Sequence, residues 1–150
     1  MIITGQAHTV APGEGRVADL GIARMRLLVA GDATAGHAFT LAEFTGGAGP
    51  WTVPHLHRAM EESFFVLDGD FTFDVGDEEI EAGPGTYVLV PPGTRQLITA
   101  GDSGGRCLVL MSPGGNEEMF FELAGLGPDA LRDPRVRAAV SAKYDSVPVL

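Results

Sequence analysis

Residues 49–62 of this chain read GPWTVPHLHRAMEE, with two histidines two positions apart and a glutamate five positions after the second. In an extended segment, residues two apart project from the same face, so His55 and His57 are expected to point side by side. Glu62 can join them only if the chain turns soon after His57 and returns as a neighbouring strand. Two imidazoles and one carboxylate suit a single divalent transition metal. The stretch therefore predicts a metal site.

The residues that follow support this turn and predict a β-rich chain. Residues 63–67 read SFFVL, a β-prone run that is closed by Asp68, Gly69 and Asp70. The whole chain contains 21 glycines and 10 prolines, which indicates frequent turns between short strands. We therefore expect an all-β domain rather than a helical bundle.

The spacing of these residues resembles the two sequence signatures of the cupins. The matching positions are Gly49, His55, His57, Glu62 and Gly69 for the first signature, and Gly85, Pro91 and Gly93 for the second. The resemblance covers residues 34–121 and implies a double-stranded β-helix, also called a jelly-roll barrel. The chain departs from the pattern at two positions. Gln96 stands where the second signature has a histidine, and Ala100 where an asparagine often follows.

The resemblance implies that His55, His57 and Glu62 hold one metal ion, which is iron, manganese, nickel or zinc. Gln96 falls at the position of the fourth ligand, and an amide oxygen is generally a weaker ligand than imidazole for the later metals of this row. Three outcomes stay open for Gln96: weak ligation, a bond to a metal-bound water, or loss of the metal. The alternative for the whole group is a hydrogen-bonded polar cluster without a metal.

The patterning predicts a single domain over residues 1–150, with the barrel core at about residues 34–112 and a helical segment at about residues 116–145. The expected strands are residues 22–29, 37–44, 71–75, 78–81, 87–90, 96–99 and 108–111. A helix is predicted at residues 117–123, and a second at residues 135–144, where Asp133 and Pro134 form a good helix start. On the second helix, Val136, Ala139 and Val140 are expected to face the barrel.

Side chains that share the inner face with these ligands predict an apolar, aromatic-lined cavity. The expected lining residues are Phe64, Val66, Phe71, Phe73, Ile98, Met119 and Phe120. His37 is expected on a strand face beside Phe39 and Leu41. A catalytic role for His37 or Glu62 is one possible assignment, and a strand-edge position for His37 is the other. The single cysteine, Cys107, lies in a buried-strand pattern and is expected to act as a small hydrophobic residue.

Composition limits the partners of the chain. The net charge is −10, and no Lys/Arg cluster stands out, which argues against nucleic acid and against anionic membranes as partners. No apolar run reaches membrane-spanning length, and the first residues lack the pattern of a signal peptide, so we expect a cytoplasmic protein. Because cupins commonly pair through their sheets, a homodimer is also expected.

The resemblance favours a metal-dependent enzyme, dioxygenase-like, that acts on an aromatic or polyketide/flavonoid-like molecule. A zinc-dependent cyclase or isomerase is the alternative enzyme. A non-catalytic cupin that binds a small hydrophobic or aromatic ligand is the alternative outside catalysis, and Gln96 is the residue that favours it. The sequence contains no other catalytic motif that competes with these readings.

Overall fold

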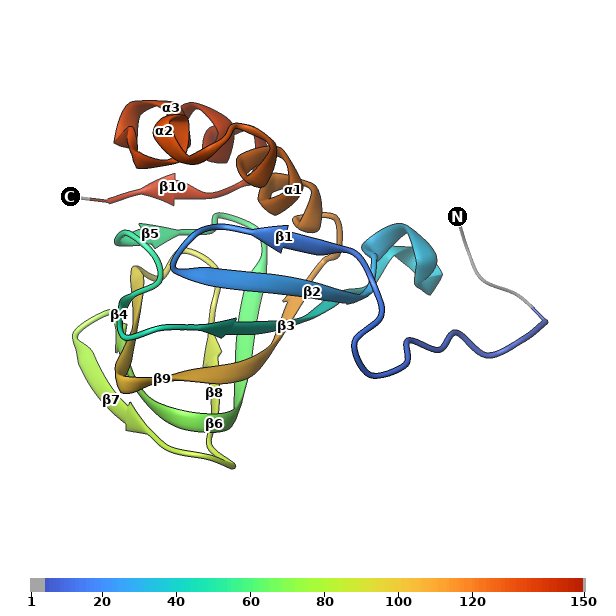
Figure 1. Cartoon of the computed structure of the whole chain (residues 1–150), viewed down its shortest axis with the longest axis horizontal. Helices are drawn as coiled ribbons and strands as arrows, with labels where there is room; N and C mark the ends of the chain where they lie inside the picture. Colours follow the sequence, from blue (N-terminus) through green and yellow to red (C-terminus); the bar gives the residue numbers. More distant parts are fainter. Residues whose placement is uncertain (1–4, 150) are drawn as a thin grey trace.

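The computed structural model describes residues 5–149, and it shows a β-roll with short helices over one end (Figure 1). Residues 1–4 and 150 of the predicted domain lie outside the described residues. The strands are β1 (Val17–Asp19), β2 (Ala23–Val29), β3 (Thr40–Gly46), β4 (Gly49–Pro50), β5 (His55–Leu56), β6 (Glu61–Val75), β7 (Glu78–Ala82), β8 (Tyr87–Val90), β9 (Gln96–Ser112) and β10 (Val147–Pro148). Two short 3-10 helices, Gly31–Ala33 and Ala35–His37, precede β3. The all-β prediction is confirmed.

Two long antiparallel strands, β6 and β9, organise the roll. They pair from Glu61 with Ser112 at one end to Val75 with Gln96 at the other. Strands β7 and β8 continue the sheet from β6, whereas β3, followed by β2 and β1, continues it from β9. Residues far apart in the sequence, such as Glu62 and Gln96, are thereby brought into one barrel.

The sequence patterning divides each long strand into two, and the structure joins the halves. Residues 68–70, predicted to end a strand, lie inside β6. There the pairing with β9 shifts register, and the strand continues. Gly69 has a φ of +78°, and a side chain there would meet the Gly104 carbonyl oxygen at 2.2 Å. Glycine is needed because only a residue without Cβ permits this conformation and this close approach. The roll bends at this point without ending the strand.

The core is built from the inward side chains of the long strands. Phe71 and Phe73 are completely buried, as their period-two spacing predicts. Phe64 packs against Phe73 with ring centroids 5.1 Å apart. Val66 and Met111 complete the most buried layer. This packed layer forms the floor beneath the candidate site.

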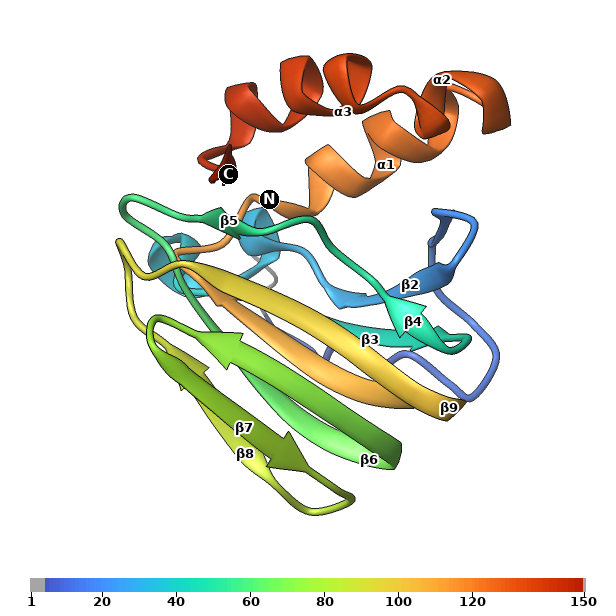
Figure 2. The same cartoon turned by 90° about the vertical axis from the view of Figure 1, so that its left-hand side faces the viewer.

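The C-terminal part covers the open end of the roll, as Figure 2 shows. It consists of α1 (Glu117–Gly125), α2 (Pro128–Arg132) and α3 (Pro134–Ser141), followed by the 3-10 turn Ala142–Tyr144 and β10. Strand β10 pairs with β5, placing Pro148 opposite His55. The predicted helical region is present, but the predicted helix at 135–144 ends at Ser141, where a 3-10 turn replaces it.

Two local predictions are wrong. His37 does not belong to a strand, because the chain turns at residues 35–37 in a 3-10 helix and His37 has a φ of 52°. The second wrong prediction is that Val136, Ala139 and Val140 of α3 all face the barrel. Only Val140 is buried, against Met119 and Leu123 of α1, whereas Ala139 is exposed.

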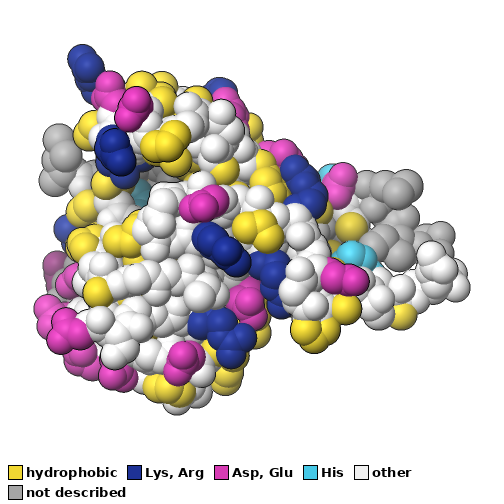
Figure 3. All heavy atoms as spheres, in the orientation of Figure 1, with side chains coloured by type: hydrophobic (Ala, Val, Ile, Leu, Met, Phe, Trp, Pro, Cys, Tyr) yellow, Lys and Arg dark blue, Asp and Glu magenta, His cyan; other side chains and the backbone are white. Residues whose placement is uncertain are grey.

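The surface view shows acidic side chains gathered over the region of β7 (Figure 3). Glu78, Glu79 and Glu81 of that strand are exposed. Within residues 5–149, no helix has the length and apolar character needed to cross a membrane.

Candidate metal centre and cavity

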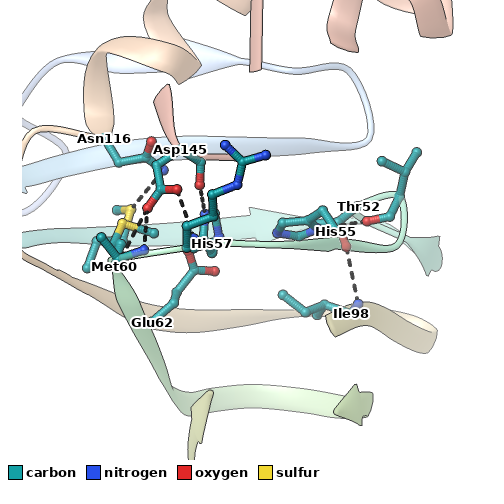
Figure 4. A network of polar contacts seen from close by, with 12 residues as sticks. Thr52, His55, His57, Met60, Glu62, Ile98, Asn116 and Asp145 are labelled. Carbon is teal, nitrogen blue, oxygen red and sulfur yellow. Dashed lines mark hydrogen bonds and ion pairs between the residues drawn. The ribbon is translucent and has the colours of Figure 1, made fainter. Parts of the chain in front are cut away.

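The two histidines and the glutamate meet at the end of the roll that the helices cover (Figure 4). His55 lies on β5, His57 follows it directly, and Glu62 is the second residue of β6. The two imidazole rings are edge to face, with centroids 5.0 Å apart. Nε2 of His57 lies 3.4 Å from Oε2 of Glu62. All three side chains are at least nine-tenths buried. The predicted turn after His57 therefore does return Glu62 to the histidines.

Backbone carbonyls hold both imidazole rings through the same nitrogen. Nδ1 of His55 lies 2.7 Å from the Val53 carbonyl oxygen, and Nδ1 of His57 lies 2.6 Å from that of Asp145. A carbonyl only accepts hydrogen bonds, so each Nδ1 carries the hydrogen and donates it. The lone pair of each neutral ring is then on Nε2. Such a fixed Nδ1–H···O=C bond is the usual support of a metal-binding histidine.

The two histidines differ in their protonation. Burial lowers the pKa of His55 and outweighs the opposing effect of Glu62, so His55 is neutral at pH 7. Burial also acts to lower the pKa of His57, but the adjacent Glu62 carboxylate and the Asp145 carbonyl overcome it and raise that pKa. In the chain without a metal, Glu62 is thus the group that favours a proton on Nε2 of His57.

Gln96 is the partner of His55 in the pairing of β5 with β9. Side chains of directly paired residues lie on the same face of a sheet, so the amide of Gln96 lies beside the His55 ring. Gln96 is 1% exposed, and no donor within residues 5–149 reaches its Oε1. A buried amide oxygen without a donor is uncommon in proteins. Its position agrees with the place of the fourth ligand in the predicted set.

The donor atoms are of the types that bind a divalent cation, but they do not lie close enough together to coordinate one. The 3.4 Å contact leaves Nε2 of His57 without a hydrogen-bond partner, as is the case for Oε1 of Gln96. Both are acceptors when His57 is neutral, and a cation would satisfy both together with the Glu62 carboxylate. Among residues 5–149, however, no three His, Cys, Asp or Glu side chains stand close enough to hold a metal ion as placed. Metal binding would require the side chains to draw together.

A cavity of about 560 Å³ extends from these residues to the C-terminal helices. This volume is in the range of small-molecule sites. Four of the seven predicted lining residues are on its wall: Phe64, Ile98, Met119 and Phe120. The other three, Val66, Phe71 and Phe73, do not line it, because they pack into the layer below and are almost completely buried. The wall also contains His55, His57 and Glu62 but not Gln96.

The structure also shows where His37 and Cys107, two further candidates from the sequence, lie relative to the cavity. His37 is exposed and does not line the cavity, so the structure gives no support to a catalytic role for it. Cys107 lines the cavity and is 1% exposed. Burial, with the nearby Glu62 and Glu43 charges, raises the pKa of the Cys107 thiol to about 12. Cys107 is therefore uncharged and agrees with the prediction of a small buried residue.

The sequence patterns did not reveal the contribution of Asp145. Its carbonyl accepts the His57 hydrogen bond, and its carboxylate accepts hydrogen bonds from the backbone amides of Arg58, Ala59 and Met60. Asp145 adopts the left-handed conformation, with φ 57° and ψ 37°. Its distance of 88 positions from His57 hides this contact from any local spacing rule. Asn116 and Arg137, which line the cavity, were also missed.

Comparison with known proteins matches part of this chain to one domain family. Residues 41–112 match the model of the cupin domain. Quercetin 2,3-dioxygenase of Bacillus subtilis (strain 168) is 26% identical over 143 residues. The match covers 90% of this chain and 42% of that protein, so the chain spans less than half the length of this curated relative.

Solved structures show the same fold. KdgF from Halomonas sp. has a TM-score of 0.65 at 16% identity, covering 73% of this chain and 98% of the other. The polyketide cyclase RemF from Streptomyces resistomycificus has a TM-score of 0.62 at 24% identity, covering 72% and 80%. At these identities the likeness supports the architecture, and the chemistry must be argued from the site itself.

Proposed function

We propose that this chain, whose residues 41–112 match the cupin-domain model, is a cupin and acts as a metal-dependent, dioxygenase-like oxidoreductase on an aromatic or polyketide/flavonoid-like molecule. One observation carries the proposal. Two imidazoles, each fixed at Nδ1 by a backbone carbonyl, stand beside the buried Glu62 carboxylate at the wall of a large apolar cavity. A buried cluster of imidazole and carboxylate groups is well suited to bind a divalent cation.

A divalent metal would be held by His55, His57, Glu62 and Gln96, and it would supply Lewis acidity and, if redox-active, activation of dioxygen. The chain itself provides the surroundings. Phe64, Ile98 and Phe120 offer apolar walls that bind an aromatic body and exclude water. Glu62 is placed to exchange a proton at Oε2, 3.4 Å from the His57 ring. The Val53 and Asp145 carbonyls keep the rings from rotating during these events.

Elemental analysis of the protein purified without added metal tests the proposal. We expect about one transition metal per chain in the wild type and a strong loss in His57→Ala. We expect tighter binding in Gln96→His, because imidazole is a better ligand than an amide oxygen for these metals. His8→Ala is the matched control, because His8 is exposed and its ring bonds to the Leu28 carbonyl, away from the predicted ligands. Metal content that is the same in His57→Ala, Gln96→His and wild type would show that the proposed ligands are wrong.

Oxygen uptake with flavonol and related substrates tests the reaction. An oxygenase consumes dioxygen only in the metal-loaded wild type, and His57→Ala abolishes the uptake. The resemblance to a quercetin 2,3-dioxygenase motivates the choice of flavonols, and it extends over 90% of this chain. Absence of uptake with iron, manganese and nickel in turn would contradict oxygenation.

Cyclisation or isomerisation is the second enzymatic candidate. It is favoured by the structural likeness to a polyketide cyclase and by an apolar cavity of sufficient size. In this case zinc would be the resident metal and Glu62 would exchange the proton. Conversion of a polyketide-like substrate without uptake of oxygen distinguishes this reaction from the first.

A binding protein without turnover is the candidate from another class. One observation favours it: Gln96 stands where the resembled pattern has a histidine, which weakens the ligand set. This candidate predicts ligand binding in the cavity that is equally strong in metal-free wild type and in His57→Ala. A metal-dependent enzyme predicts turnover that is lost in the variant.

A further inference from the structure

One face of α3 forms part of the cavity wall. Pro134, Arg137, Ala138 and Ser141 line the cavity, and their spacing of three, four and seven places them on one side of the helix. Three of these residues are small or apolar. The fourth, Arg137, places a guanidinium group where the helix faces the cavity.

Arg137 carries a side-chain nitrogen that finds no hydrogen-bond partner within residues 5–149. This nitrogen, Nε, is buried. Within residues 5–149, the guanidinium forms no ion pair, although its charge contributes to lowering the pKa of Asp133. The neighbouring Arg135 is different, since it bonds to Asp133 through two nitrogens. A buried donor without an acceptor is costly, so a ligand that supplies an acceptor gains the corresponding stabilisation.

The charges of the cavity wall are divided between its two sides. Glu62 is the acidic residue of the wall and comes from the barrel, beside the two histidines. Both basic residues of the wall, Arg135 and Arg137, come from α3 on the opposite, helical side. The chain carries a net charge of −10, so a positive group facing the cavity is a local exception rather than a general property of the surface.

A second polar group on the wall lacks a full set of partners. Asn116 is 7% exposed, and in the described part of the chain its Oδ1 accepts no hydrogen bond, while its Nδ2 donates to the Met111 sulfur at 3.8 Å. Apart from these groups and the histidine cluster, large apolar side chains such as Phe120, Leu123 and Leu131 dominate the helical side. Because Arg135 is already bonded to Asp133, the wall offers Arg137 as a cationic donor and Asn116 as a neutral acceptor on an apolar background.

From this arrangement we propose that the cavity selects an aromatic carboxylate, with Arg137 pairing the carboxylate and Asn116 accepting from a hydroxyl or amine of the ligand. A guanidinium matches a carboxylate in shape, because two parallel N–H···O bonds form at once. The aromatic body then lies between the helices and the barrel, toward His55 and His57. This inference deepens the proposed function and rests on the use of the same cavity for substrate.

Calorimetric titration with 2-naphthoate and 2-naphthamide tests the selection directly. The two probes have nearly the same size and differ in charge at the group that Arg137 is proposed to bind. We expect wild-type protein to bind naphthoate more tightly, and Arg137→Gln to weaken naphthoate binding by about tenfold. Naphthamide binding should change by less than a factor of two. The matched control is Arg132→Gln, because Arg132 is exposed on α2 and does not line the cavity.

The remaining variants make every outcome informative. Arg137→Lys keeps the charge but not the planar fork, and it should recover part of the naphthoate affinity. An equal loss of both probes in Arg137→Gln, or no loss of either, would overturn the inference. The titrations use metal-free protein and involve no turnover, so they can fail while the metal analysis of His57→Ala succeeds, and the reverse. Failure of the carboxylate selection can therefore be told apart from failure of the metal proposal.

Discussion

At the scale of single residues, Asp145 shows how a distant position shapes the site. Its left-handed backbone is unusual for a residue other than glycine, although aspartate tolerates it better than most. In this conformation the carbonyl of Asp145 accepts a hydrogen bond from His57, and its carboxylate accepts hydrogen bonds from the backbone amides of residues 58–60. Burial alone would raise the pKa of Asp145, but the amides of Ala59, Arg58 and Met60 outweigh it and lower that pKa. Asp145 is therefore a charged anchor of the loop between the predicted ligands.

Replacing Asp145 tests this anchor. We expect Asp145→Ala to lower the free energy of unfolding by about 1–2 kcal/mol, because three backbone amides lose their acceptor in a partly exposed position. Asp145→Asn should lose less, since asparagine keeps one acceptor oxygen and also tolerates the left-handed conformation. Urea denaturation measures both changes. Asp129→Ala on α2 is the control and should change little, so an equal loss in this variant would contradict the anchor.

The residue scale also shows what the sequence could reveal of the site. The pair His55 and His57 and its neighbour Glu62 were predictable, because strand periodicity and one turn fix their meeting. Asp145, Asn116 and Arg137 were not, because their roles depend on how the C-terminal helices dock on the roll. His37 was wrongly placed because the alternation of residues 37–44 continues into a turn, where only the backbone conformation reveals the end of the strand.

At the scale of elements, the helix start of α3 fixes the face that reaches the cavity. Asp133 caps this helix by accepting from the amide of Arg135, and Pro134 occupies the first turn. The side chain of Arg135 also bonds to Asp133, and this contact, with the backbone amides, lowers the pKa of Asp133 below its ordinary value of 3.8. The sequence predicted this cap correctly. The sequence did not predict which side of α3 faces the cavity. Arg137 lines the cavity, although amphipathic patterning assigns its position to solvent.

The lowered pKa of Asp133 predicts a pH dependence with a definite sign. A carboxyl group whose pKa is lowered by folding stabilises the fold above its unfolded pKa and loses that effect as the pH falls through the folded value. We expect wild type to be more stable than Asp133→Asn by a constant amount near neutral pH. The difference should shrink as the pH falls below about 4. Asparagine retains the capping oxygen, so urea titrations at several pH values isolate the charge. A difference that grows on acidification would contradict the assignment.

The long strands mark another limit of prediction at this scale. Alternation correctly placed Phe71 and Phe73 in the core. The sequence predicts that residues 68–70, which contain Gly69, close a strand, and it predicts separate strands at residues 96–99 and 108–111; in the structure β6 and β9 run continuously through these regions. A glycine in a strand pattern marks either a turn or a close backbone approach, and local sequence alone does not distinguish the two.

At the scale of the whole molecule, the acidic, β-rich roll presents an outer face with exposed apolar groups. Phe65 of β6 pairs with Tyr87 of β8, and both are exposed, as is the nearby Leu89. Neighbouring exposed apolar side chains of this kind often mark contact surfaces. The homodimer and the cytoplasmic location expected from the sequence stay predictions, and this face is where we expect two copies to meet.

Light scattering after size-exclusion chromatography measures the assembly. We expect wild-type protein at twice the mass of one chain, and Tyr87→Glu to shift the population toward the single chain, because a charge in an apolar contact is costly to bury. Val17→Glu is the matched control, since Val17 is also exposed but belongs to β1. A wild-type mass equal to one chain at all concentrations would contradict the expected dimer.

The attachment of the C-terminal segment has a consequence for how related proteins can diverge. The predicted ligands belong to residues 55–96, whereas the basic groups of the cavity wall belong to a helix that follows the barrel in the sequence. Strand β10 then fastens the end of this segment to the strand that carries His55. If both proposals hold, reactivity and selectivity are encoded in consecutive stretches of one gene. Exchange of residues 116–141 between relatives, which keeps Asp145 and its bond to His57 in place, is expected to transfer preference for a substrate while leaving the reactive centre intact.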